Sequence, residues 1–175
     1  MALRQILKDG DRTLNKKSRA VTDFNARLHQ LLDDMRETLS NADGVGLAAP
    51  QVGVLRRAVL VVDTTGEGEA MEECVLELIN PEIVTVSGEQ TGTEGCLSVP
   101  GVYGIVTRPE TVTVRAQDRF GSFFEVSGSG LTARAFCHEI NHLDGILFTE
   151  LATEILTPEQ LEEMAALDEE TDSEA

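Results

Sequence analysis

One eight-residue stretch, Ala135-Phe-Cys-His-Glu-Ile-Asn-His142, constrains this chain more than any other part of its sequence. It places His138 and His142 four residues apart, with Glu139 directly after the first histidine. Residues at this spacing lie one above the other on one face of an α-helix, so both imidazoles can bind one metal ion. Glu139 is then close enough to move a proton on metal-bound water without being a ligand. The alternative is a helix that carries two histidines by chance, although the chain has 3 in all.

Length, charge and hydropathy predict a single globular domain. The chain has 175 residues, 41% of them hydrophobic, which is enough for one buried core. We expect residues 1–167 to form this domain and residues 168–175 to be an acidic, disordered tail. A net charge of −17 argues against DNA or another nucleic acid as a partner, because phosphate binding needs clustered Lys and Arg. The sequence shows no membrane-spanning run and no secretory signal, so we expect a cytoplasmic protein without a membrane partner.

Hydrophobic periodicity predicts an α+β fold: an N-terminal helix, several antiparallel strands, then the helix that carries both histidines (the central helix) and a C-terminal helix. An N-terminal helix is expected from Asp23, because apolar residues recur at helical spacing after it. A C-terminal helix is expected after Thr157, where Thr157 and Gln160 can form a capping box. The central helix should span 131–142. Strands are expected at 57–63, 75–80, 82–86, 111–117 and 123–126, the last two as a hairpin.

A catalytic metal of this kind has three protein ligands and one position open for water, so a third ligand is needed. Downstream of the central helix the candidates are acidic: Asp144, Glu150 and Glu154. Upstream, the segment Glu94-Gly-Cys-Leu-Ser98 offers Cys96, which could instead be a buried free cysteine in a loop. Spacing alone leaves both sets open.

Three segments in order closely resemble the signature motifs of the peptide deformylases: Gly44-Val-Gly-Leu-Ala-Ala-Pro-Gln51, Glu94-Gly-Cys-Leu-Ser98 and His138-Glu-Ile-Asn-His142. The resemblance extends over nearly the whole chain except the acidic tail. It implies the fold outlined above, with mixed, mostly antiparallel strands around the central helix. It also implies a metal ion bound by Cys96, His138 and His142, with water as the fourth ligand. It also implies Fe(II) as the metal, often replaced by Zn, Ni or Co in purified protein, and the ligand set suits all four.

The same resemblance implies hydrolysis of the N-formyl group from the initiator methionine of nascent polypeptides. Metal-bound water would attack the formyl carbon, with Glu139 as general base and then general acid. The oxyanion would be stabilised by the side-chain amide of Gln51 and the backbone N–H of Leu97. Three further positions match substrate-binding groups of the family: the backbone of Val45 and Gly46, which would pair with the peptide as an added strand, and Leu131, in the methionine pocket.

One position departs from the pattern of the family. Asn141 stands where the family usually has an aspartate that pairs with an arginine, here Arg108. An asparagine can still accept a hydrogen bond from a guanidinium, but the charge-assisted component is lost. We therefore expect lower stability or a shifted helix rather than lost chemistry.

Two other functions compete with this interpretation. A zinc endopeptidase of the His-Glu-x-x-His kind would take a downstream ligand and leave Cys96 idle. A catalytically weakened, peptide-binding relic of the same fold would explain Asn141 as a sign of decay. Docking on the ribosome is left as an open hypothesis. The acidic tail does not favour it, because its negative charge has the wrong sign for contact with RNA.

Overall fold

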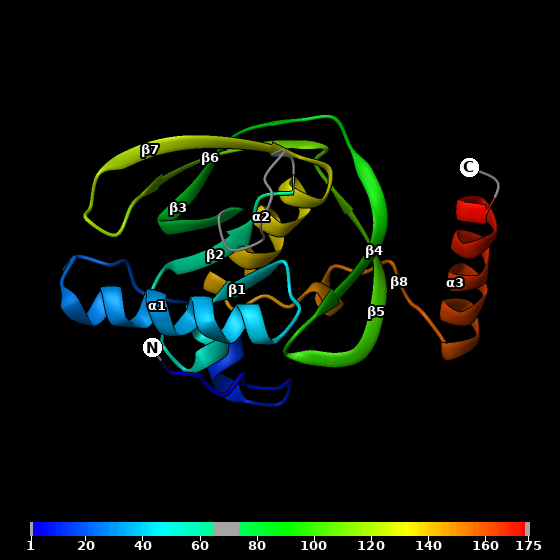
Figure 1. The fold of residues 1–175 in the computed structure, drawn as a ribbon, viewed down its shortest axis with the longest axis horizontal. Helices are drawn as coiled ribbons and strands as arrows, with labels where there is room; N and C mark the ends of the chain where they lie inside the picture. The colour runs from blue at the N-terminus through cyan, green and yellow to red at the C-terminus, as the bar shows by residue number, and fades with distance from the viewer. Residues whose placement is uncertain (1, 65–73, 174–175) are drawn as a thin grey trace.

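Helix α2 (Gly130–Leu143) carries both histidines and lies at the centre of the computed structural model, which describes residues 2–64 and 74–173 (Figure 1). It packs on one face of a five-stranded sheet, and helix α1 (Ala26–Asn41) packs on the other face. These layers confirm the predicted α+β fold, with an N-terminal helix and a central helix that bears the motif.

Strand β2 (Ala58–Val62) explains why the chain folds into these layers, because every residue in it is apolar and buried. Ala58, Leu60 and Val62 pack in the cluster around α1, whereas Val59 and Val61 pack in the cluster around α2. Successive side chains of a strand point to opposite faces, so a strand covered on both faces needs a continuous apolar run. Burying each larger side chain of this kind contributes roughly 1.5–3 kcal/mol.

Helix α1 begins three residues later than the sequence predicted. Asn25 is its N-cap, and its side chain accepts hydrogen bonds from the backbone N–H groups of Arg27 and Leu28. A capping asparagine satisfies donors that the first helical turn leaves without partners. The predicted apolar face is buried in the core: Leu28, Leu31, Leu32, Met35 and Leu39.

The five-stranded sheet has the order β1-β2-β3-β6-β7, with each neighbouring pair antiparallel. The predicted hairpin is confirmed as β6 and β7, and β7 leads directly into α2. Strand β1 lies at the edge of this sheet, beside the metal-motif helix. Besides β2, its strands are β1 (Gly46–Ala48), β3 (Val75–Ser87), β6 (Thr111–Gln117) and β7 (Phe123–Ser129).

Strand β3 corrects one prediction, because 75–80 and 82–86 belong to one strand instead of two. Asn80 adopts a φ of 50°, and the register with β6 shifts at this point, so the strand bends without ending. Asparagine tolerates this left-handed conformation better than most residues. Its side chain also accepts from the N–H of Val21 at 2.8 Å and donates to the carbonyl of Val21 at 2.9 Å, which fixes the bend.

A second, three-stranded antiparallel sheet has the order β4-β5-β8. Sequence analysis predicted no strand between residues 90 and 108, because this region is polar and rich in glycine and lacks a clear apolar alternation. The turn between β4 and β5 brings Cys96 against α2. The strands are β4 (Gln90–Cys96), β5 (Val99–Arg108) and β8 (Glu154–Ile155).

Helix α3 (Pro158–Ser173) follows β8 and stands away from both sheets in Figure 1. It begins with the predicted capping box, in which Thr157 and Gln160 each donate a backbone N–H to the other side chain. The disordered tail expected from residue 168 differs from the structure, where the helix continues to Ser173 without a Gly or Pro to interrupt it. Residues 174–175 lie outside the described residues, and the domain boundary at 167 stays a prediction. No helix in the described part of the chain is long and apolar enough to cross a bilayer.

Candidate metal centre and active site

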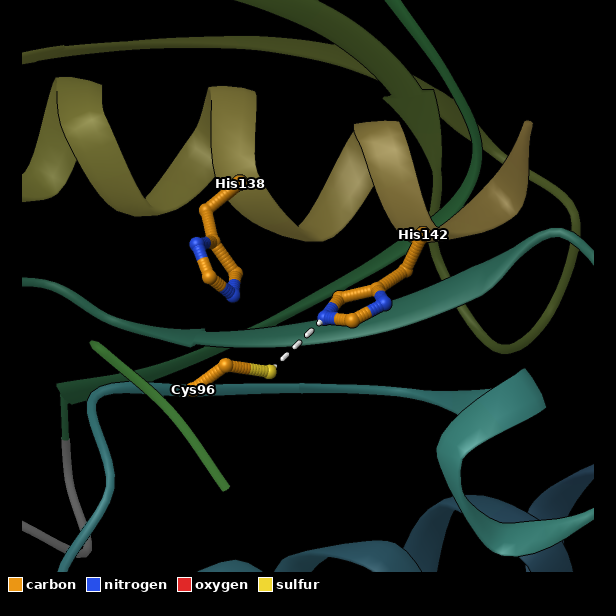
Figure 2. Close-up of side chains that lie close together, drawn as sticks. All are labelled: Cys96, His138 and His142. Atoms are coloured by element: carbon orange, nitrogen blue, oxygen red, sulfur yellow. Dashed lines mark hydrogen bonds between the residues drawn. The ribbon is translucent and has the colours of Figure 1, made fainter. Parts of the chain in front are cut away.

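The three predicted ligands, Cys96, His138 and His142, meet at one point between α2 and the end of β4 (Figure 2). Both imidazoles point from the same face of α2 toward Cys96, and their ring centroids lie 5.0 Å apart. The sulfur of Cys96 is 3.3 Å from Nε2 of His142, and one ligand atom from each residue lies within 4.8 Å of the others. Three donor atoms this close together could hold one metal ion.

The charges around these side chains fit a cation. Nδ1 of His138 donates to Oε2 of Glu94 at 2.9 Å, which leaves Nε2 of that ring for a metal. Burial opposes the charged form of His138, but hydrogen bonds to Cys96 and Glu94 raise its pKa to about 10. Burial lowers the pKa of His142 to about 3, so this ring is neutral and can offer a lone pair. The surroundings that favour a proton on His138 also favour a metal ion in place of that proton, because both are cations.

The acidic residues downstream of α2 point elsewhere. Asp144 forms an ion pair with Arg57 at 2.9 Å. Glu150 accepts a backbone N–H at the start of a short helix at 2.8 Å, and Glu154 accepts from a side-chain amide of α3 at 2.6 Å. Among the described residues, no acidic side chain joins the two histidines in a group that could hold a metal. The geometry therefore supports Cys96 as the third donor.

Glu94 holds this cluster in place, although sequence analysis assigned it no role. Its carboxylate accepts from Arg108 at 2.8 and 3.0 Å, from Arg134 at 3.0 Å and from His138 at 2.9 Å. Burial opposes its charged form, but hydrogen bonds from His138 and Arg108 hold the pKa of Glu94 at about 2. Arg108 also donates to Oδ1 of Asn141 at 2.6 Å, so the predicted contact between these two residues is confirmed. A charged residue two positions before a ligand is the signal that could have indicated Glu94.

Glu139 lines a cavity of about 590 Å³ beside the cluster. Its side chain is buried, and its Oε2 atom has no hydrogen-bond partner among the described residues. Burial raises the pKa of Glu139 to about 7, which suits a group that takes and returns a proton near neutral pH. Gly46 lies directly against it, because a Cβ at that position would be 2.5 Å from Oε1 of Glu139. Only glycine fits here without moving the carboxylate.

Gln51 is buried with its amide turned toward the metal-binding cluster. Its Oε1 accepts from the backbone N–H of Ala48 at 2.8 Å, which fixes the direction of the amide. Its Nε2 then donates to Oγ of Ser98 at 3.1 Å and lies 3.6 Å from the sulfur of Cys96. The remaining residues predicted for the active site line the same cavity as Gln51 and Glu139: Val45, Gly46, Leu97 and Leu131.

Two imidazoles and a thiol around one point, with a proton-accepting carboxylate on the adjoining cavity, are typical of metal-dependent hydrolases. Comparisons with known proteins narrow this class. The sequence model of the polypeptide deformylase family matches residues 3–156. The chain therefore belongs to the polypeptide deformylase family, and its activity is metal-dependent peptide deformylation.

Individual relatives support this assignment along most of the chain. A peptide deformylase of Caldicellulosiruptor bescii is 51% identical over 174 residues, which cover 99% of this chain and 100% of that protein. One from Lachnoclostridium phytofermentans is 57% identical over 150 residues, covering 86% of this chain and 89% of its own. The crystal structure of a peptide deformylase from Legionella pneumophila matches with a TM-score of 0.79 at 41% identity, covering 95% of this chain and 98% of that one.

Proposed function

We propose that this enzyme removes the formyl group from the N-terminal methionine of nascent polypeptides, with a single Fe(II) ion held by Cys96, His138 and His142. The observation that carries the proposal is the meeting of one sulfur and two imidazole nitrogens within 4.8 Å, next to the cavity that Glu139 lines. Thiol and imidazole ligands suit Fe(II) and equally Zn, Ni or Co, so metal analysis has to distinguish them.

When bound, the ion acidifies a water molecule and polarises the formyl oxygen. Glu139 would accept a proton from the attacking water as the water oxygen bonds to the formyl carbon. It then gives a proton to the amine that leaves when the C–N bond breaks, so formate and a free methionyl amine result. A carboxyl whose pKa burial raises to about 7 can serve in both steps near neutral pH.

Two donors are proposed to stabilise the negative charge that develops on the formyl oxygen: the side-chain amide of Gln51 and the backbone N–H of Leu97. The contact of Gln51 Nε2 with Ser98 and its approach to Cys96 support this role, because both hold the amide at the cluster. The side chain of Gln51 is itself buried, and a hydrogen bond to an anion gains strength where the donor is shielded from water.

The peptide is proposed to bind as an extra strand alongside Val45 and Gly46. Strand β1 is at the edge of its sheet, so one side of its backbone faces the cavity instead of another strand. Main-chain pairing of this kind accepts any downstream sequence. Leu131, 49% exposed on the cavity wall, would contact the methionine side chain. A substrate that emerges from translation would place the enzyme in the cytoplasm, and docking on the ribosome stays a hypothesis.

The endopeptidase alternative finds no support in the geometry, since its candidate ligands pair elsewhere and Cys96 is the residue that lies beside the two histidines. The test is anaerobic purification with metal analysis, followed by assays on formyl-Met-Ala-Ser and on an internal peptide without a formyl group. We expect one Fe(II) per chain and release of formate only from the formylated peptide. Glu139→Ala should abolish turnover, whereas the matched control Glu82→Ala, an exposed residue of β3, should not. Cleavage of the internal peptide would overturn the proposal.

A further inference from the structure

The N-terminal segment 7–9 joins the two sheets at the active site. The backbone N–H of Leu7 donates to the carbonyl of Gln51 at 2.7 Å, and that of Asp9 donates to the carbonyl of Ser98 at 2.8 Å. Gln51 follows β1 of the five-stranded sheet, whereas Ser98 lies in the turn between β4 and β5 of the three-stranded sheet. One short segment therefore forms hydrogen bonds with both parts of the chain that carry the proposed oxyanion donors.

Lys8 adds a contact to one of these donors itself. Its Nζ donates to the carbonyl oxygen of Leu97 at 2.8 Å, and the side chain lines the catalytic cavity. The residue is exposed, so no core packing depends on it. The Leu97 carbonyl and the Leu97 N–H belong to adjacent peptide planes that meet at the Leu97 Cα. Holding the carbonyl fixes one of these planes, so the direction of the N–H then depends only on rotation about the two backbone bonds of Leu97.

Hydrophobic packing holds this N-terminal segment in place on two opposite sides, without involving the metal-binding cluster. Ile6 packs against the core cluster around α1, whereas Leu7 packs against the smaller core cluster that contains Leu14 and Phe148. Successive residues of an extended segment point to opposite sides, which explains how it can contact both. The packing of Ile6 and Leu7 therefore holds the backbone at Lys8 in place. From this position the ammonium group of Lys8 can restrain the turn at Leu97.

We propose that Lys8 is a positioning residue, which orients the Leu97 N–H toward the developing oxyanion through its bond to the Leu97 carbonyl. The proposal rests on the role proposed above for Leu97. Removing an oxyanion donor outright costs roughly 10²–10³ in kcat. Loosening one that stays in place should cost less, and we expect a loss of about tenfold.

The test compares Lys8→Met, which loses the donor, with Lys8→Arg, which can still reach the carbonyl. Lys17→Met, which removes another exposed lysine of the N-terminal region, is the matched control. Turnover is measured with an uncharged, C-terminally amidated formyl-Met peptide, so that the lost charge does not change substrate attraction. We expect kcat to fall about tenfold in Lys8→Met with KM within twofold, and Lys8→Arg to restore most of it. The melting temperature should stay close to that of the wild type.

Amide hydrogen exchange of the segment around residues 95–99 gives a second readout that does not depend on catalysis. Exchange there should be faster in Lys8→Met than in Lys17→Met or Lys8→Arg. Equal exchange and equal kcat in Lys8→Met and Lys17→Met would overturn the positioning role, and so would equal losses in Lys8→Met and Lys8→Arg. If the wild-type enzyme shows no deformylase activity but exchange is still faster in Lys8→Met than in Lys17→Met, the proposed function is wrong and the restraint on Leu97 is supported.

Discussion

Replacing Glu94 by glutamine is the sharpest perturbation of this active site, because it keeps the shape of the side chain and removes its charge. The carboxylate accepts from both Arg108 and Arg134 and orients the ring of His138. The side-chain oxygen of the glutamine can still accept a hydrogen bond. The NH₂ group, however, would face an N–H donor at the position where the second carboxylate oxygen accepts a hydrogen bond. Two buried guanidinium groups would then lose their shared negative partner.

The pKa of Glu94 gives the size of the effect. Hydrogen bonds from His138 and Arg108 hold it at about 2, against its usual value of 4.5. Because the folded value is the lower one, the stabilisation is fully present above pH 4.5 and is lost as the pH falls from 4.5 toward 2. At neutral pH the difference corresponds to about 3 kcal/mol of unfolding free energy. Roughly 2 kcal/mol of this should be lost between pH 5 and pH 3.

Urea unfolding of wild type and Glu94→Gln at pH 7, 5 and 3, with a chelator present throughout, measures this contribution. We expect the variant to be less stable by about 3 kcal/mol at pH 7 and pH 5, and the gap to narrow at pH 3. A separate titration of the metal at pH 7 should show affinity about 10–100-fold lower, because the partner of His138 Nδ1 has lost its charge. A stability gap that stays constant from pH 7 to pH 3 would refute the assignment of Glu94 as a buried carboxylate with a depressed pKa.

Three further substitutions test separate parts of the site. Cys96→Ser should reduce bound metal well below one ion per chain by elemental analysis, whereas full retention would remove Cys96 from the ligand set. Gly46→Ala should lower kcat/KM at least about tenfold in a deformylase assay, since its Cβ would meet the Glu139 carboxylate at 2.5 Å. Asn141→Asp should raise the free energy of unfolding by about 1 kcal/mol through a charge-assisted bond to Arg108, with turnover unchanged within a few-fold. An increase in turnover by orders of magnitude without a gain in stability would contradict that account.

The parts of the fold that the sequence could predict are those where a local pattern carries the information. Helix α1 has apolar residues at helical spacing, and β2 is a continuous apolar run, so both were recognisable from a few neighbouring residues. The histidines of α2 were recognisable in the same way, because a spacing of four residues fixes their relation within one helix. In each case the interacting residues are close together in the chain.

The parts that could not be predicted depend on contacts between distant residues. Strands β4 and β5 contain glycine and polar residues, and they are held by pairing with each other and by the contact of β5 with α2. The choice of Cys96 over the downstream acids rested on resemblance, since no local pattern links a cysteine to a histidine 46 residues later. The bonds of segment 7–9 to Gln51 and Ser98 leave no trace in sequence spacing for the same reason.

Because Asn141 is neutral, Glu94 alone, within the described part of the chain, supplies the negative charge for this group of hydrogen-bonded side chains. Arg108 donates both to Asn141 and to Glu94, but only Glu94 can balance its charge. Arg134 and His138 also donate hydrogen bonds to the carboxylate of Glu94, so two guanidinium groups and an imidazole share one anion. An aspartate at 141 would give Arg108 a second carboxylate. With asparagine there, Glu94 is the one carboxylate that accepts hydrogen bonds from Arg108 among the described residues. The carboxylate of Glu94 therefore joins β4 to α2 and also orients His138, a proposed metal ligand. The free energy of unfolding and the affinity for metal should consequently fall together when this carboxylate is lost.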